Sequence, residues 1–180
     1  MRLIVSEFVT LDGVMEAPEK WVFQFAEKEI DALKLDEVLA ADALLLGGVT
    51  YQIFAESWPS RSDPDGFADK MNSMPKYVVS ATSEKLAWKN SHQIKGNALA
   101  EIPRLKQQSG RGILVVGSSV LVQTLIQHDL VDEYRLLVYP LVLGKGKRLL
   151  QDGRQARLKL VKAHTFRMGV VLLQYQSQST

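Results

Sequence analysis

The stretch Leu114-Val115-Val116-Gly117-Ser118-Ser119-Val120-Leu121 sets the fold class, because it joins an apolar run to a helix-like segment through a turn of small residues. A second stretch, Leu44-Leu45-Leu46-Gly47-Gly48-Val49-Thr50-Tyr51, repeats this pattern. Each stretch predicts a strand, a glycine turn and the start of a helix. The first amide groups of a helix lack intrahelical partners, so an anion can approach the backbone there. One copy is more often an ordinary tight turn, and two copies make a paired diphosphate site an equal alternative.

Strand-like and helix-like segments alternate along the rest of the chain, which is typical of an α/β fold. Apolar runs predict strands at Leu3–Val9, Asp42–Leu46, Lys76–Ser80 and Ile113–Val116. Apolar residues at helical spacing predict helices over 22–33, 51–58 and 121–126. A further helix is expected around Ala98–Gln108, shortened or kinked by Pro103.

The last third of the chain predicts an antiparallel hairpin. Residues 134–138 form a strand that Pro140 ends, and two strand-like runs flank the turn Arg167-Met168-Gly169. The expected architecture is a three-layer α/β sandwich over residues 1–180, as a single domain. Its central sheet is mixed and mostly parallel, with helices on both faces and the hairpin at its C-terminal end. The segment 59–75 is expected to be the longest irregular stretch and a mobile rim.

Composition narrows the classes of function. The chain has 180 residues, 46% of them hydrophobic, and 22 basic against 20 acidic residues give a formal net charge of +2. This small excess predicts neither nucleic-acid nor anionic-membrane binding. No apolar run is long enough for a membrane span or a signal-peptide core, and the absence of cysteine favours a cytoplasmic location.

Other catalytic patterns have little support. His92, His128 and His164 stand far apart without ligand spacing, so no metal site is expected. The standard dinucleotide fingerprint and the serine-hydrolase elbow are absent. Asp12 stands out because it follows the first strand, at the edge where open α/β sheets bind ligands, although a turn-forming Asp-Gly is the commoner explanation. Trp21 is either a core anchor or one wall of an aromatic pocket.

Seven segments, taken in order, resemble the dihydrofolate-reductase-like superfamily. They are Val9-Thr-Leu-Asp-Gly-Val14, Leu45-Leu-Gly-Gly-Val-Thr-Tyr51, Trp58-Pro59, Val78-Val-Ser-Ala-Thr82, Val115-Val-Gly-Ser-Ser-Val-Leu121, Leu130-Val-Asp-Glu-Tyr-Arg-Leu136 and Tyr139-Pro-Leu-Val-Leu-Gly-Lys-Gly146. The resemblance is strongest to the riboflavin-biosynthesis reductase branch, which comprises the C-terminal domain of bifunctional deaminase-reductases and its stand-alone relatives. It spans nearly the whole chain.

The resemblance implies a reductase that uses NADPH, with NADH possible, and acts on a small heteroaromatic or carbonyl-containing metabolite such as a pteridine or a ribosylaminopyrimidine. It places the following residues at the cofactor: Gly47, Gly48, Val49 and Thr50 at a phosphate, Ser80 and Thr82 near the adenosine 2′-phosphate, and Gly117, Ser118, Ser119, Val120 and Leu121 around the diphosphate. It places Asp12, Trp21 and Tyr51 at the substrate. Relatives pair through sheet-edge strands, so a homodimer is expected.

Asp12 is the candidate for the group that orients the substrate or relays the proton that accompanies hydride transfer. Glu7, Glu16 and an ordered water are the alternatives. Dihydrofolate is a less favoured substrate, since no acidic residue near the start of the first helix is clearly placed to bind a pterin.

Two departures from the family pattern bear on binding. Gly48 stands where the family usually has an arginine that pairs with phosphate, which leaves the choice between NADPH and NADH open; Lys76 or Lys85 can compensate. The family often has a cis peptide between two glycines where this chain has Gly117-Ser118. A nucleotide-binding or interaction protein without turnover, and a phosphate-ligand enzyme without redox chemistry, therefore remain as alternatives.

Overall fold

The computed structural model describes residues 1–80, 86–151 and 156–178, and these form one sheet with strand order β4-β3-β2-β5-β1-β6-β8-β7. The strands are β1 (Arg2–Thr10), β2 (Ala43–Gly47), β3 (Lys76–Val79), β4 (Ser91–Ile94), β5 (Gly112–Val115), β6 (Glu133–Tyr139), β7 (Leu158–Thr165) and β8 (Val171–Ser177). The α-helices are α1 (Lys28–Ala40), α2 (Gly48–Ser57), α3 (Phe67–Ser73), α4 (Ala98–Gln107) and α5 (Ser119–Gln127). Two 3-10 turns, η1 (Pro18–Lys20) and η2 (Val22–Phe25), precede α1.

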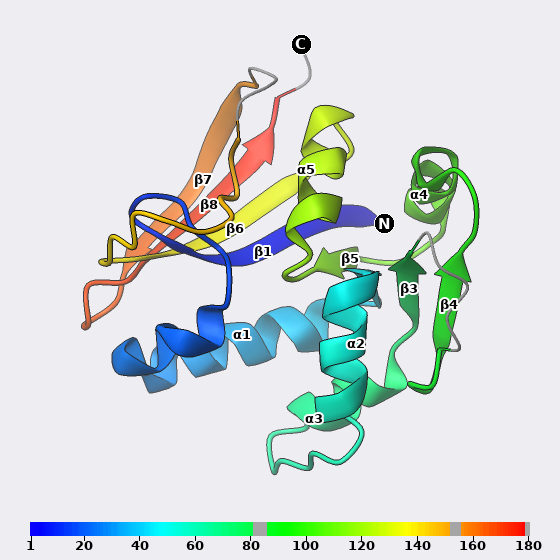
Figure 1. The fold of residues 1–180 in the computed structure, drawn as a ribbon, viewed down its shortest axis with the longest axis horizontal. Coiled ribbons are helices and arrows are strands. Elements are labelled where there is room, and N and C mark those ends of the chain that lie inside the picture. Colours follow the sequence, from blue (N-terminus) through cyan, green and yellow to red (C-terminus); the bar gives the residue numbers. More distant parts are fainter. Residues whose placement is uncertain (81–85, 152–155, 179–180) are drawn as a thin grey trace.

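Helices cover both faces of the sheet, which confirms the predicted α/β sandwich (Figure 1). On one face, Ile102 of α4 and Leu125 of α5 pack in a core cluster with Leu3 of β1. On the other face, Val38 of α1 and Met71 of α3 belong to a second cluster. Neighbouring strands from β4 to β6 are parallel, so the carboxyl ends of β1, β2, β3 and β5 meet at one edge of the sheet.

The C-terminal hairpin is antiparallel, as predicted. β8 pairs with β6 and then with β7, and a register shift lies between Leu160 and Lys162. Gly169 supplies the turn with its φ of 81°. β7 is the outermost strand, and most of its side chains are exposed.

Two predicted segments differ from the structure. The stretch 59–75 is not irregular throughout, because α3 forms within it: the carboxylate of Asp63 accepts hydrogen bonds from the Phe67 and Ala68 amides and caps the helix start. The helix predicted over 22–33 is interrupted, since Ala26 has extended backbone between η2 and α1. Apolar spacing alone did not reveal this break.

Two further features complete the fold. β4 was not predicted, because Ser91–Ile94 is short and mostly polar. α4 runs through Pro103 to Gln107, and the side chain of Asn97 caps its first turn. No helix of the described residues is long and apolar enough to cross a membrane.

Lys76 does not take the compensating role suggested by the sequence, because it is fully buried at the start of β3, at the opposite end of that strand from Ser80. Its ammonium donates to the carbonyl oxygens of Asn72 at 2.7 Å and Lys89 at 2.9 Å, and it lies 4.3 Å from the ring centre of Trp88. Burial lowers the pKa of Lys76 to about 8, with a smaller contribution from Lys89.

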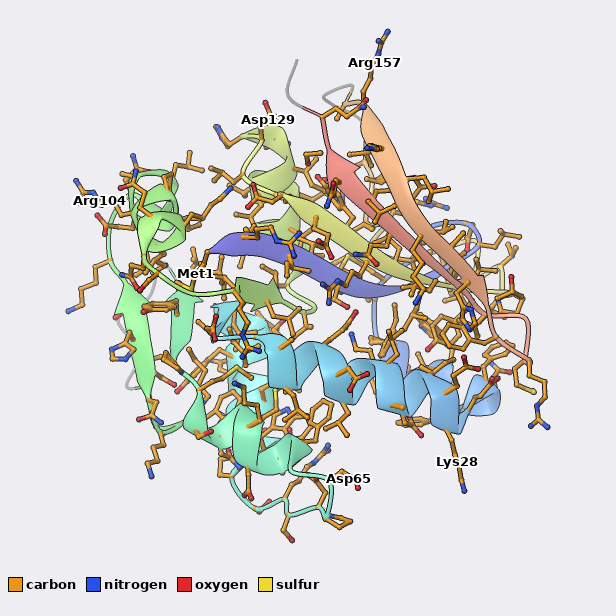
Figure 2. All side chains as sticks on the ribbon, turned by 180° about the vertical axis from the view of Figure 1, so that it is seen from behind. Met1, Lys28, Asp65, Arg104, Asp129 and Arg157 are labelled. Atoms are coloured by element: carbon orange, nitrogen blue, oxygen red, sulfur yellow. The ribbon has the colours of Figure 1, made fainter. Side chains whose placement is uncertain are left out.

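We expect this buried charge to make stability depend on pH. The unfolded chain holds the Lys76 proton up to its ordinary pKa of 10.5 and the folded chain only up to about 8. The free energy of unfolding should therefore rise between these values in the wild type, by about 3 kcal/mol relative to Lys76→Met. Urea unfolding across this pH range measures the difference. Lys28→Met, at an exposed position on α1 (Figure 2), is the control and should follow the wild type.

Candidate functional site

The two glycine turns lie against each other at the carboxyl edge of the sheet. The Gly47 amide donates to the Ser118 hydroxyl at 2.9 Å. In return, a Cβ on Gly117 would lie only 3.2 Å from the Thr50 methyl group. Each turn thus places its glycine against a hydroxyl residue of the other turn. The sequence predicted two such helix starts, and the structure brings them together.

The second turn has a left-handed backbone conformation at two successive residues. Gly117 and Ser118 both have a φ of 64°, which is a left-handed conformation. This conformation is energetically unfavourable for a residue that has a Cβ atom. The peptide between them is trans. The hydroxyl of Ser118 does not cap α5 and instead binds the first turn.

The residues after each turn differ in exposure. Val49 of α2 is 73% exposed and Val120 of α5 is 74% exposed, so both face solvent beside the helix starts. Leu121 is buried in the core, so that only its backbone is placed to meet a ligand. Together, two helices of ten and nine residues point their amino ends toward this edge. Such ends carry partial positive charge and favour an anion.

Ser80 occupies the space beside Gly48. A Cβ on Gly48 would lie 3.0 Å from the Ser80 hydroxyl oxygen, so an arginine there would require Ser80 to move. Ser80 follows β3 and lies next to the first turn. Thr82 and Lys85 lie outside the described residues.

Glu7 of β1 is the buried acid of this edge. Glu7 is only 5% exposed. Its Oε2 accepts a hydrogen bond from the Gly117 amide at 3.0 Å. Its Oε1 is buried without a hydrogen-bond partner. Burial raises the pKa of Glu7 well above its ordinary value, although the Gly117 amide and Lys34 act in the opposite direction. Burial therefore favours the neutral form of this carboxyl group.

Asp12 is an anchor for a neighbouring loop. Its carboxylate accepts the Thr10 hydroxyl at 2.6 Å, the Leu143 amide at 3.2 Å and the Gly144 amide at 2.8 Å. The Thr10 hydroxyl and these amides lower the pKa of Asp12 to about 2. Asp12 is therefore ionised near neutral pH.

The loop that Asp12 anchors pairs with the chain after β1. Val14 and Arg148 form an antiparallel bridge, and the Met15 amide donates to the Lys147 carbonyl at 2.9 Å. Glu16, the other alternative acid, is exposed and lies 3.9 Å from Lys147. The segment after β1 and the segment around Arg148 lie next to one another beyond the end of β1 (Figure 1).

Trp21 and Tyr51, the suggested substrate residues, are both buried. Trp21 packs edge-on against Tyr139 and its indole donates to the Glu16 carbonyl at 3.1 Å. The Tyr51 hydroxyl accepts the Trp88 amide at 2.9 Å within the second core cluster. In the described structure both side chains pack in core clusters.

The acidic residues near the start of α1 are engaged with the hairpin. The Glu27 carboxylate accepts the Arg167 and Met168 amides, at 3.2 and 3.1 Å. Glu29 lies 2.8 Å from the His164 ring nitrogen. No cluster of potential metal ligands occurs among the described residues.

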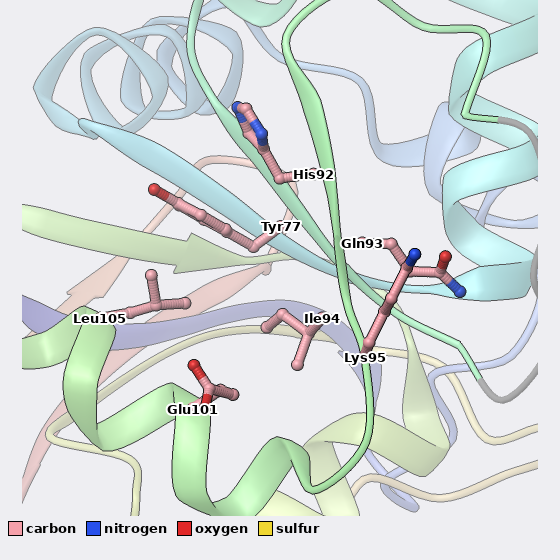
Figure 3. A pocket seen from close by; sticks show the side chains of 7 residues that line it. All are labelled: Tyr77, His92, Gln93, Ile94, Lys95, Glu101 and Leu105. Atoms are coloured by element: carbon pink, nitrogen blue, oxygen red, sulfur yellow. The ribbon is translucent and has the colours of Figure 1, made fainter.

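A shallow pocket of about 210 Å³ lies elsewhere, between α4 and the outer strands. Figure 3 shows Tyr77 and Ile94 of the strands facing Glu101 and Leu105 of α4. His92 lies beside Tyr77, with ring centres 5.7 Å apart. None of the turn residues lines this pocket, so it does not belong to the candidate site.

Known proteins resemble this chain over almost its whole length. Residues 2–172 match the family described as the RibD C-terminal domain. YyaP, an uncharacterized protein of Bacillus subtilis, is 34% identical over 178 residues, which cover 97% of this chain and 94% of that protein.

Solved structures share the fold. A putative riboflavin biosynthesis protein from Shewanella sp. PV-4 superposes with a TM-score of 0.76 at 20% identity, covering 99% of this chain and 100% of that one. Dihydrofolate reductase from Enterococcus faecalis, in a complex with NADP(H), superposes with a TM-score of 0.66 at 13% identity, covering 99% and 97%. These likenesses confirm the dihydrofolate-reductase-like architecture that the sequence motifs suggested.

The Asp12 anchor predicts a loss of stability in acid. The pKa of Asp12 is about 2 in the folded chain and near 3.8 when unperturbed, so its stabilisation is complete above 3.8 and disappears as pH falls toward 2. The free energy of unfolding of Asp12→Asn, measured against pH, should lack this acid-range component. An equal pH slope in wild type and variant would contradict the anchor.

Proposed function

Because the chain belongs to the RibD C-terminal domain family, we propose that it is an NAD(P)H-dependent reductase. Its substrate is a small heteroaromatic or carbonyl-containing metabolite of the pteridine or ribosylaminopyrimidine class. Residues 1–180 act as one domain. The observation that carries the proposal is the contact between the two glycine turns, since it places two positive helix ends side by side.

The residues fit a nicotinamide dinucleotide. A Cβ at Gly47, Gly48 or Gly117 would lie 3.0–3.3 Å from a side chain of a neighbouring segment, so glycine lets these segments pack closely. The backbone amides of the two helix starts can then meet a diphosphate. Gly47, Gly48, Val49 and Thr50 bind one phosphate, and Gly117, Ser118, Ser119, Val120 and Leu121 bind the other. The bound dihydronicotinamide supplies a hydride. The chain's own residues hold the cofactor, orient the substrate near the loop after β1 and exclude water.

The preferred cofactor is NADPH, with NADH as the alternative. Ser80 lies beside Gly48, where the family arginine would start, and offers a hydroxyl in place of a guanidinium. A hydroxyl binds a phosphate more weakly than a bidentate guanidinium does. We therefore expect a smaller preference for the 2′-phosphate than in relatives with the arginine.

The same substitution favours a second candidate, a nucleotide-binding protein without turnover. Gly48 removes a charged contact with the cofactor, and the suggested replacement Lys76 is buried elsewhere. Binding without reduction of any pteridine or pyrimidine would support this candidate. Reduction at a measurable rate would support the reductase.

Binding is tested by titration with NADPH and NADH, followed by tryptophan quenching and energy transfer to the nicotinamide. We expect saturable binding to the wild type and at least about tenfold weaker binding to Gly117→Asp, because its side chain would meet Thr50 and add negative charge at the turn. Gly96→Asp is the matched control, since Gly96 also has a positive φ, of 79°, but open space around it. No saturable signal with either nucleotide would remove the proposal.

We further propose that the protein forms a homodimer through the hairpin edge. Leu160 and Val161 of β7 are 51% and 47% exposed, on the outermost strand of the sheet. Pairing would cover this apolar surface, which is otherwise prone to association. Light scattering after size exclusion should show a dimer for the wild type and for Val142→Glu, and a monomer for Leu160→Glu. A monomeric wild type would refute this assembly.

A further inference from the structure

Glu7 has a position that packing alone does not explain. The residue lies in β1 between Val5 and Val9, both of which belong to the core cluster under α5. Because side chains alternate along a strand, Glu7 points toward α5 as well. A carboxyl group in an aliphatic cluster is costly unless its polar atoms are bonded.

The bonding of Glu7 is incomplete and directed at the second turn. Oε2 accepts the Gly117 amide at 3.0 Å, while Oε1 is buried with no partner. The turn that it holds is the one with two successive left-handed residues, Gly117 and Ser118. Glu7 therefore fixes the backbone that begins α5, next to the space proposed for the diphosphate.

The charges around Glu7 are few. Lys34 of α1 is the cation that lowers the pKa of Glu7, and its ammonium is already bonded to Glu37 at 2.6 Å. β5 and α5 carry no ionisable side chain. β6 carries Glu133 and Arg135, which pair with each other at 2.6 Å. Charge on Glu7 would thus be poorly compensated, and it would compete with a bound anion for the positive end of α5.

We propose that Glu7 is a positioning residue that holds the Gly117 turn as a neutral acid and couples nucleotide binding at the two turns to proton binding. This inference rests on the proposed nucleotide-binding function. In the neutral form, Glu7 binds the amide without opposing the diphosphate. In the ionised form, its negative charge repels the diphosphate, so that nucleotide binding and proton binding favour each other.

The direction of the coupling between nucleotide binding and proton binding at Glu7 follows from the charges. The negative nucleotide raises the pKa of Glu7 further, so binding takes up a proton at pH values where the free protein has begun to ionise. Affinity should therefore fall as pH rises above the free-protein pKa, by at most about tenfold per pH unit for one proton. A side chain with a purely structural role would produce no such uptake.

The experiment compares the wild type with Glu7→Gln, which keeps the amide acceptor and cannot ionise. NADPH binding is measured by calorimetry from pH 6 to 9, in pairs of buffers with different ionisation enthalpies. We expect proton uptake and falling affinity in the wild type, and neither in Glu7→Gln. Glu101→Gln, on exposed α4 surface, is the control and should behave as the wild type. Carbon-13 NMR of the carboxyl groups gives the pKa of Glu7 directly.

The possible results separate a failure of the Glu7 coupling from a failure of the proposed nucleotide binding. Binding with the same pH dependence in the wild type and Glu7→Gln overturns the coupling and leaves the proposed function standing. An ordinary pKa for Glu7, near 4.5, also overturns it. Absence of nucleotide binding to both proteins at every pH overturns the proposed function, and the coupling with it. If Glu7→Gln does not fold, Glu7→Met replaces it as the variant that cannot ionise.

Discussion

The hydrogen bond from the Gly47 amide to the Ser118 hydroxyl, at 2.9 Å, is the contact on which the candidate site depends. It ties the end of β2 to the start of α5, which come from distant parts of the sequence. β5, the strand before α5, is the neighbour of β2 in the sheet. Gly117 completes the contact from the other side, against Thr50. Because each turn fills part of the other, neither helix start can shift alone.

Two acids, one in β1 and one just after it, show how environment assigns different roles to the same functional group. Asp12 accepts a hydroxyl and two amides and is ionised, so it serves as a fixed negative anchor. Glu7 has one amide partner and lies between residues of an apolar cluster, so burial shifts it toward the neutral form. The difference comes from hydrogen bonding and burial, since both groups are carboxyls with similar intrinsic acidity.

The sequence predicted the parts of the structure that depend on local pattern. The apolar runs, the two glycine turns and the C-terminal hairpin follow from periodicity and turn chemistry, and the structure confirms them. It did not predict α3, whose start depends on an Asp63 cap, or β4, which is short and polar. The state of Glu7 and the buried position of Lys76 arise from tertiary packing, which periodicity cannot reveal.

The strand order has a consequence for how the chain acquires its structure. β1 is synthesised first, yet its neighbours are β5 and β6, with Arg2 opposite Gly112 and Ile4 opposite Glu133. β1 finds its partner strands only after the chain has been synthesised as far as Gly112. Strand pairing of β1 therefore waits for these later segments, so the central layer closes late and folding depends on contacts of high sequence separation.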